Sequence, residues 1–94
     1  MIRSFGDRRT QRFAQGEFVK AFESIKVAAR RRLAVLDAAD SLDVLAALRG
    51  NRLEVLRGKR KGQLSIRINE QWRICFRWND AEKSAEQVEI VDYH

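Results

Sequence analysis

Apolar residues recur at helical spacing in the first half of the chain and at every second position in its last third. Within residues 18–39 the steps are three and four residues, which places one apolar stripe along an α-helix. The stripe comprises Phe18, Phe22, Ile25, Ala29, Leu33 and Leu36. A shorter helix is expected over residues 41–48, because Asp40 or Ser41 can cap its first turn.

The start of the chain predicts a strand and a short helix. Residues 2–5 are expected to form a short strand, and Asp7 can cap a basic helix over residues 8–14. Gly16 ends that helix, because glycine readily leaves the helical conformation.

The last part of the chain predicts an antiparallel meander. Strands are expected at residues 53–56, 63–68, 72–78 and 87–93, with turns at 69–71 and 79–85. Helices in front of a meander are typical of an α+β fold, with N-terminal helices packed on one face of a small, mainly antiparallel sheet. The length of 94 residues suits a single domain, residues 1–94.

Alternation assigns the strand residues to two faces. The helix-covered face is expected to hold Leu64, Ile66, Ile68, Trp72, Ile74, Phe76, Trp78, Val88 and Ile90. The opposite face then holds Ser65, Arg67, Arg73, Cys75, Arg77, Glu89, Val91 and Tyr93. This second face is expected to be uncovered and to bring Arg67, Arg73 and Tyr93 together.

Positive charge is concentrated in the strand region. Residues 57–78 contain a single acid, Glu70, and seven basic residues: Arg57, Lys59, Arg60, Lys61, Arg67, Arg73 and Arg77. The whole chain has a formal net charge of +6. A cationic surface of this kind favours a polyanionic partner, of which nucleic acid is the most common.

Other function classes are disfavoured by composition. The early part of the chain is rich in arginine and contains no long apolar run, so neither a secretory signal nor a membrane span fits, and a cytoplasmic protein is expected. Cys75 is the only cysteine and His94 the only histidine, so we expect no metal site and no cofactor.

A glycine-flanked basic loop lies between the first two strands of the meander. Its sequence is Arg57-Gly58-Lys59-Arg60-Lys61-Gly62, and the glycines give the backbone freedom to approach a phosphate. We predict that Arg57, Lys59, Arg60 and Lys61, together with Arg67, bind RNA.

The remaining candidates suit cleavage of RNA by its own 2'-hydroxyl, which requires a base, a cation and an acid. Arg73 and Arg67 are suitable cations, because a guanidinium binds phosphate oxygens bidentately and stays charged. The chain ends in Asp92, Tyr93 and His94. An imidazole transfers protons at neutral pH, Tyr93 could instead stack on a base, and Asp92 could orient the histidine or hold an arginine.

Several motifs together resemble the HigB toxins of the RelE/ParE superfamily. They are the segment from Asn51 to Gly62 containing L-R-G-K-R-K-G, then S-I-R-I-N at residues 65–69, W-R-I-C-F-R-W at 72–78 and the terminal D-Y-H. Residues 1–5 also match, whereas residues 15–47 match more in the type of residue than in motif. The resemblance implies a RelE-like, microbial-RNase-like fold.

The resemblance implies a toxin that cleaves messenger RNA in the ribosomal A site without a metal, restrained by a HigA-like helix-turn-helix antitoxin. Arg73 would stabilise the transition state, and the segment Asp92-Tyr93-His94 would transfer protons and position the base. Arg57, Lys59 and Lys61 would hold RNA or ribosomal RNA. Some relatives have a histidine where this chain has Glu54. Glu54 would therefore act as an additional base, or the chain end would serve both proton transfers.

Two other functions are consistent with the same features. One is a ParE-like toxin that binds DNA gyrase and catalyses no reaction, although such a binder has no need of a proton donor. The other is a non-catalytic nucleic-acid-binding module that uses the basic face.

Overall fold

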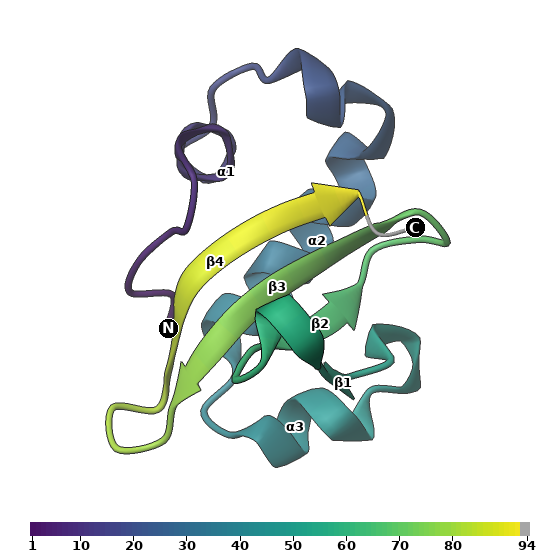
Figure 1. The fold of residues 1–94 in the computed structure, drawn as a ribbon. Helices are drawn as coiled ribbons and strands as arrows, with labels where there is room; N and C mark the ends of the chain where they lie inside the picture. Colours follow the sequence, from purple (N-terminus) through teal and green to yellow (C-terminus); the bar gives the residue numbers. More distant parts are fainter. Residues whose placement is uncertain (93–94) are drawn as a thin grey trace.

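The computed structural model describes residues 1–92 and confirms the α+β fold (Figure 1). Its α-helices are α1 (Arg8–Ala14), α2 (Lys26–Ala38) and α3 (Leu42–Ala47), and its strands are β1 (Glu54–Val55), β2 (Leu64–Arg67), β3 (Trp72–Asn79) and β4 (Ser84–Asp92). Short 3-10 helices are η1 (Lys20–Ile25), η2 (Arg49–Asn51) and η3 (Gly58–Arg60). The strand order is β1-β2-β3-β4, and neighbouring strands are antiparallel.

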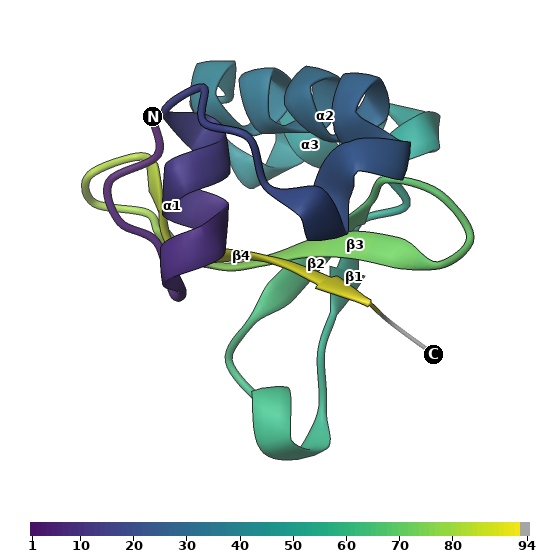
Figure 2. The same ribbon diagram turned by 90° about the horizontal axis from the view of Figure 1, so that it is seen from above.

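The apolar core lies between the helices and one face of the sheet (Figure 2). Side chains with no exposed surface include Phe22, Leu36, Ile66, Ile74, Phe76, Val88 and Ile90, so the predicted alternation is confirmed. Phe22 makes two edge-to-face contacts. Its ring centroid lies 5.3 Å from that of Phe13 within the helical layer and 5.7 Å from that of Trp72 on β3, and the second contact joins the helices to the sheet. None of the helices within residues 1–92 has the length and hydropathy that crossing a membrane requires.

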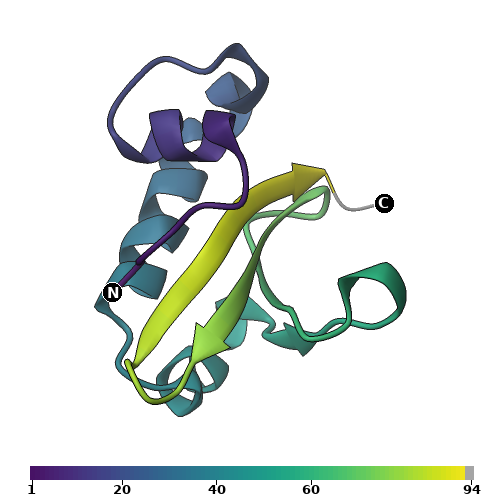
Figure 3. The same cartoon turned by 60° about the vertical axis from the view of Figure 1, so that its left-hand side comes forward.

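The N-terminal segment runs beside β4 (Figure 3). Ile2 and Phe5 form parallel bridges to Ala85 and Val88, so the predicted strand is reduced to two isolated pairs. As expected, Asp7 caps α1 by accepting a hydrogen bond from the Thr10 amide at 2.7 Å.

The single helix predicted over residues 18–39 is wrong at its start. The segment is the 3-10 helix η1 followed by α2, and Phe18 lies outside both with 67% of its surface exposed. Phe22 and Ile25, three residues apart, are both buried. That spacing matches the three residues per turn of a 3-10 helix, so packing selects the tighter turn.

The predicted strands are present with different ends. Strand β1 is only two residues long, and β4 begins at Ser84 rather than at residue 87. The earlier start has a clear cause, because Ala85 pairs with Trp78 on β3 and also exchanges backbone hydrogen bonds with the N-terminal segment. A register irregularity between Cys75 and Arg77 accompanies a left-handed Gln87, with φ of 53°.

We call the sheet face away from the helices the far face. The expectation that it is uncovered is wrong at its centre, where Ser65 and Cys75 have no exposed surface and Arg73 is 8% exposed. The loop after β1 stands on this side of the sheet, opposite the helices (Figure 2). Leu56, which begins that loop, is itself buried. Tertiary packing thus encloses polar residues that alternation alone would leave in water.

Candidate functional site

An open hollow of about 380 Å³ lies at one end of the far face. It is lined by Arg52, Glu54, Arg67, Asn69, Glu70 and Arg73, which we call the arginine hollow. Strands β2 and β3 place Arg67 and Arg73 directly opposite each other in register. The two arginines predicted to act together are therefore neighbours on one surface.

Arg73 is held by protein groups that fix the plane of its guanidinium. Its Nε donates to the Oγ of Ser65 at 2.7 Å, and its Nη2 donates to the carbonyl oxygens of Arg52 and Ser65. Ser65 and Arg52 contribute uncharged acceptors here, so they orient the guanidinium without neutralising it. A fixed cation of this kind is suited to bind an anion whose position must be exact to a fraction of an ångström.

Glu54 brings a carboxylate to the same hollow. Its Oε1 lies 3.7 Å from Nη1 of Arg73, and 53% of its side chain is exposed. The separation is an ion-pair distance rather than a hydrogen bond. Glu54 is therefore a solvent-accessible carboxylate adjacent to a positioned cation.

The other hollow residues come from the turn between β2 and β3 and from the segment before β1. The Oδ1 of Asn69 accepts hydrogen bonds from the amides of Gln71 and Trp72, at 2.8 and 2.7 Å, and so fixes this turn. Arg52 has a left-handed backbone, with φ of 43°. Sequence reasoning missed Arg52, Asn69 and Glu70 as members of the site. Only the proximity of Gly50 to Arg52, and the turn predicted at residues 69–71, could have indicated them.

The chain end is described only as far as Asp92. Asp92 pairs in register with Trp72, next to Arg73 in sequence, and accepts a hydrogen bond from the side-chain amide of Gln71 at 3.0 Å. The end of β4 therefore runs beside the strand that carries Arg73. Tyr93 and His94, the other two predicted catalytic residues of this segment, lie outside the described residues.

The basic loop (residues 57–62) presents its cations in two ways. Arg57, Lys59 and Lys61 are exposed, and within residues 1–92 none of them forms an ion pair. Arg60 instead turns toward the sheet, where it pairs with Glu89. Gly58 and Gly62 adopt positive φ, 65° and 92°, which explains the glycines at these positions.

Cys75 takes no visible part in the site. Burial raises the pKa of its thiol, so it is uncharged at neutral pH, and it is not part of a disulfide. Over residues 1–92 no three His, Cys, Asp or Glu side chains gather as metal ligands would.

Two comparisons with known proteins bear on this site. The profile of one family, described as the RelE-like toxin of type II toxin-antitoxin system HigB, matches residues 3–94. A curated relative, Toxin HigB-1 of Vibrio cholerae serotype O1, is 47% identical over 57 residues. That alignment covers 61% of this chain and 60% of the relative, so the chain spans about three fifths of the length of the relative it matches.

Proposed function

Because the chain belongs to the HigB family of RelE-like toxins in type II toxin–antitoxin systems, we propose that it is a metal-independent endoribonuclease. Its substrate is messenger RNA in the A site of the small ribosomal subunit, and cleavage stops translation in the cytoplasm. A cognate HigA-like helix-turn-helix antitoxin restrains it. The observation that supports this proposal most is the arginine hollow, in which a buried and oriented Arg73 lies beside the carboxylate of Glu54.

In the proposed reaction the 2'-hydroxyl of the RNA attacks the adjacent phosphorus, and the 5'-oxygen of the next nucleotide leaves. Negative charge builds on the phosphorane oxygens as the new bond forms. Arg73 stabilises that charge, and Arg67, its register partner, binds the same phosphate or the next one. One well-placed donor of this kind contributes about 2.7 to 4 kcal/mol.

Two proton transfers accompany the reaction. Glu54 and the segment Asp92-Tyr93-His94 are the groups available for them, one accepting the 2'-hydroxyl proton and the other supplying a proton to the leaving oxygen. Each transfer contributes about 10² to 10⁴-fold. Which group has which role is decided by comparing the pH dependence of cleavage in Glu54→Gln and His94→Ala.

The basic loop provides the means to hold RNA. Arg57, Lys59 and Lys61 are exposed beside the far face, and each phosphate contact on a single strand adds a salt-dependence slope of about 0.7. Binding of this kind carries no sequence information, so the ribosome must present the scissile phosphate. Accordingly, naked messenger RNA should be cut poorly or not at all, and efficient cutting by the purified protein would contradict this part of the proposal.

The decisive experiment is a reconstituted translation reaction in which cleavage ends are mapped on the translated transcript. Arg73→Ala should lower cleavage about 10² to 10³-fold while ribosome binding is retained. The matched control is Arg8→Ala, which removes an exposed arginine from α1 that does not line the arginine hollow, and it should cleave like the parent.

The same experiment, together with a gyrase supercoiling assay, tests both alternative functions. If Arg73→Ala loses ribosome binding and the parent protein yields no new RNA ends, the chain is a binding module. If the parent instead inhibits DNA supercoiling by gyrase and leaves transcripts intact, it is a ParE-like toxin. Either result overturns the nuclease.

A further inference from the structure

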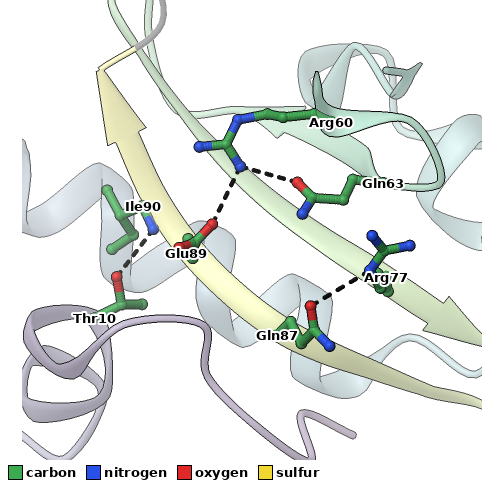
Figure 4. Close-up of polar contacts among 7 residues, drawn as sticks. All are labelled: Thr10, Arg60, Gln63, Arg77, Gln87, Glu89 and Ile90. Carbon is green, nitrogen blue, oxygen red and sulfur yellow. Dashed lines mark hydrogen bonds and ion pairs between the residues drawn. The ribbon is translucent and has the colours of Figure 1, made fainter. Parts of the chain in front are cut away.

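One arginine of the basic loop faces inward and joins the loop to the far side of the sheet. The Nη1 of Arg60 donates to Oε2 of Glu89 at 3.1 Å and to Oε1 of Gln63 at 2.9 Å (Figure 4). The loop connects β1 to β2, whereas Glu89 lies on β4. The Arg60 side chain therefore crosses β3 to reach its partner.

This ion pair is more protected from water than the exposed pairs of the molecule. The side chains of Arg60 and Glu89 are 36% and 23% exposed. In the pair between Arg3 of the N-terminal segment and Glu82 of the turn between β3 and β4, they are 46% and 56% exposed. Lower exposure means weaker screening by solvent and salt, so the Arg60–Glu89 pair constrains geometry more than an ordinary surface pair does.

The residue under this crossing is Cys75. It lies on β3 in register with Glu89 on one side and with Ser65 on the other, and it has no exposed surface. No α-helix covers this face (Figure 2). We attribute the cover to the loop, which stands on this side of the sheet, and to the Arg60 side chain, whose positive charge opposes the rise that burial causes in the pKa of the Cys75 thiol.

Glu89 has room for this contact because of a glycine in the N-terminal segment. A Cβ atom at Gly6 would lie 2.6 Å from Cγ of Glu89, which is closer than such atoms approach each other. Gly6 also donates its amide to the carbonyl of Val88 at 2.9 Å, so its backbone is fixed against β4.

We propose that Glu89 is a positioning residue, which acts through Arg60 to hold the basic loop so that Arg57, Lys59 and Lys61 face the RNA in a fixed arrangement. The inference rests on the proposed function, because it takes RNA as the ligand of the loop. A loop that is ordered before binding loses less conformational entropy when it binds, and therefore binds more tightly. Glu89 thereby strengthens the binding of a polyanion, although its own charge repels one.

The first test uses the fact that the two roles of Glu89, as a repulsive charge and as a positioning residue, have opposite effects on RNA binding. If Glu89 were only a surface acid, Glu89→Gln would remove a repulsive charge and tighten binding to RNA. If Glu89 positions the loop, the same variant should raise KM for programmed ribosomes about fivefold and leave kcat within about twofold. The matched control is Glu82→Gln, which removes the same charge and breaks the exposed pair with Arg3, at a site remote in sequence from the loop. Binding by Glu89→Gln that equals or exceeds that of Glu82→Gln would overturn the proposal.

The second test measures how accessible the thiol of Cys75, the only cysteine of the chain, is to a soluble reagent. Arg60→Gln removes a cation that favours the thiolate, so a charge effect alone would slow the reaction of Cys75 with a soluble disulfide reagent. Loss of the cover should instead speed labelling at least about tenfold at the same pH. Labelling at the parent rate or below would overturn the proposal.

Two measurements distinguish loss of loop order from global unfolding, and failure of this inference from failure of the proposed function. Urea unfolding of Arg60→Gln shows whether faster labelling reflects global instability, which would give the same midpoint shift for labelling and for circular dichroism. If the parent protein binds neither ribosomes nor single-stranded RNA, the proposed function is overturned, and its RNA ligand with it. The labelling experiment still decides whether Arg60 holds the loop over Cys75.

Discussion

The two faces of the sheet are both buried at their centres, but by different means. On the helix side, Ile74 and Phe76 are enclosed by apolar side chains of α1, η1 and α2. On the far face, Cys75 has no exposed surface and lies in register with Glu89, which pairs with Arg60 of the basic loop. Arg73 is 8% exposed and donates hydrogen bonds to Ser65 and to the carbonyl of Arg52. Apolar burial stabilises the fold without fixing any single contact, whereas the polar far face fixes particular atoms.

This difference indicates that the helix side mainly stabilises the fold and the far face mainly serves activity. Burying a guanidinium costs free energy unless its donors are satisfied, so a protein gains little stability from Arg73. A cation oriented by Ser65 and the carbonyl of Arg52 is nevertheless what charge stabilisation in a transition state needs. Changes on the helix side should therefore alter unfolding, and changes on the far face should alter activity.

The largest effect is expected from Phe76→Ala on the helix side. The side chain has no exposed surface, and its removal should lower the free energy of unfolding by about 3 to 5 kcal/mol. That is a large part of the roughly 5 to 15 kcal/mol that typically stabilises a domain. Urea unfolding followed by circular dichroism measures it. Cys75→Ala, one residue away on the far face, is the control. An equal loss of unfolding free energy in that variant would contradict the separate roles of the two faces.

A weaker effect, on binding alone, is expected when the exposed charges of the basic loop are removed. Replacing Arg57, Lys59 and Lys61 together with glutamine should lower the slope of log affinity against log salt by about 2 for single-stranded RNA. A salt titration of an RNA oligonucleotide measures the slope. The control replaces Arg8, Lys20 and Arg31 on the helix side, and an equal loss of slope there would place the RNA elsewhere.

Ser65→Ala should reduce cleavage about tenfold through kcat, because Arg73 loses the acceptor of its Nε. Ser65→Thr retains the hydroxyl and should recover most of the rate, which a purely structural role would not require. Ser84→Ala is the matched control, since Ser84 is also fully buried and its Oγ has no hydrogen-bond partner within residues 1–92. A rise in KM with an unchanged kcat would contradict this role of Ser65.

The smallest effect concerns pH. Burial raises the pKa of the Cys75 thiol, so the folded protein keeps its proton when the unfolded chain has lost it. The stability associated with the protonated thiol is fully present below the unfolded pKa of about 8.5 and declines as pH rises above it. The free energy of unfolding of the parent should therefore fall more between pH 7 and about 9.5 than that of Cys75→Ala. Parallel pH profiles for the two proteins would contradict the shift.

The sequence alone determined the fold class and the pairing of the strands. Alternation at every second position assigned Ile66, Ile74, Phe76, Val88 and Ile90 to the core, because side chains on a strand point to opposite faces in turn. It also placed Arg67 and Arg73 together, since both follow the opposite phase on adjacent antiparallel strands. Local capping chemistry gave α1 and α3 their starts at Asp7 and Ser41.

Only the tertiary structure decided how the far face is used. Periodicity reports which side of a sheet a residue is on, but it does not report what covers that side, because cover depends on contacts between segments distant in sequence. Arg60 and Glu89 are 29 residues apart, and Arg73 and the carbonyl of Arg52 are 21 apart. For the same reason the basic residues of 57–78, alike in sequence, have three different environments. Arg73 is a buried cation, Arg60 pairs with Glu89, and Arg57, Lys59 and Lys61 are exposed.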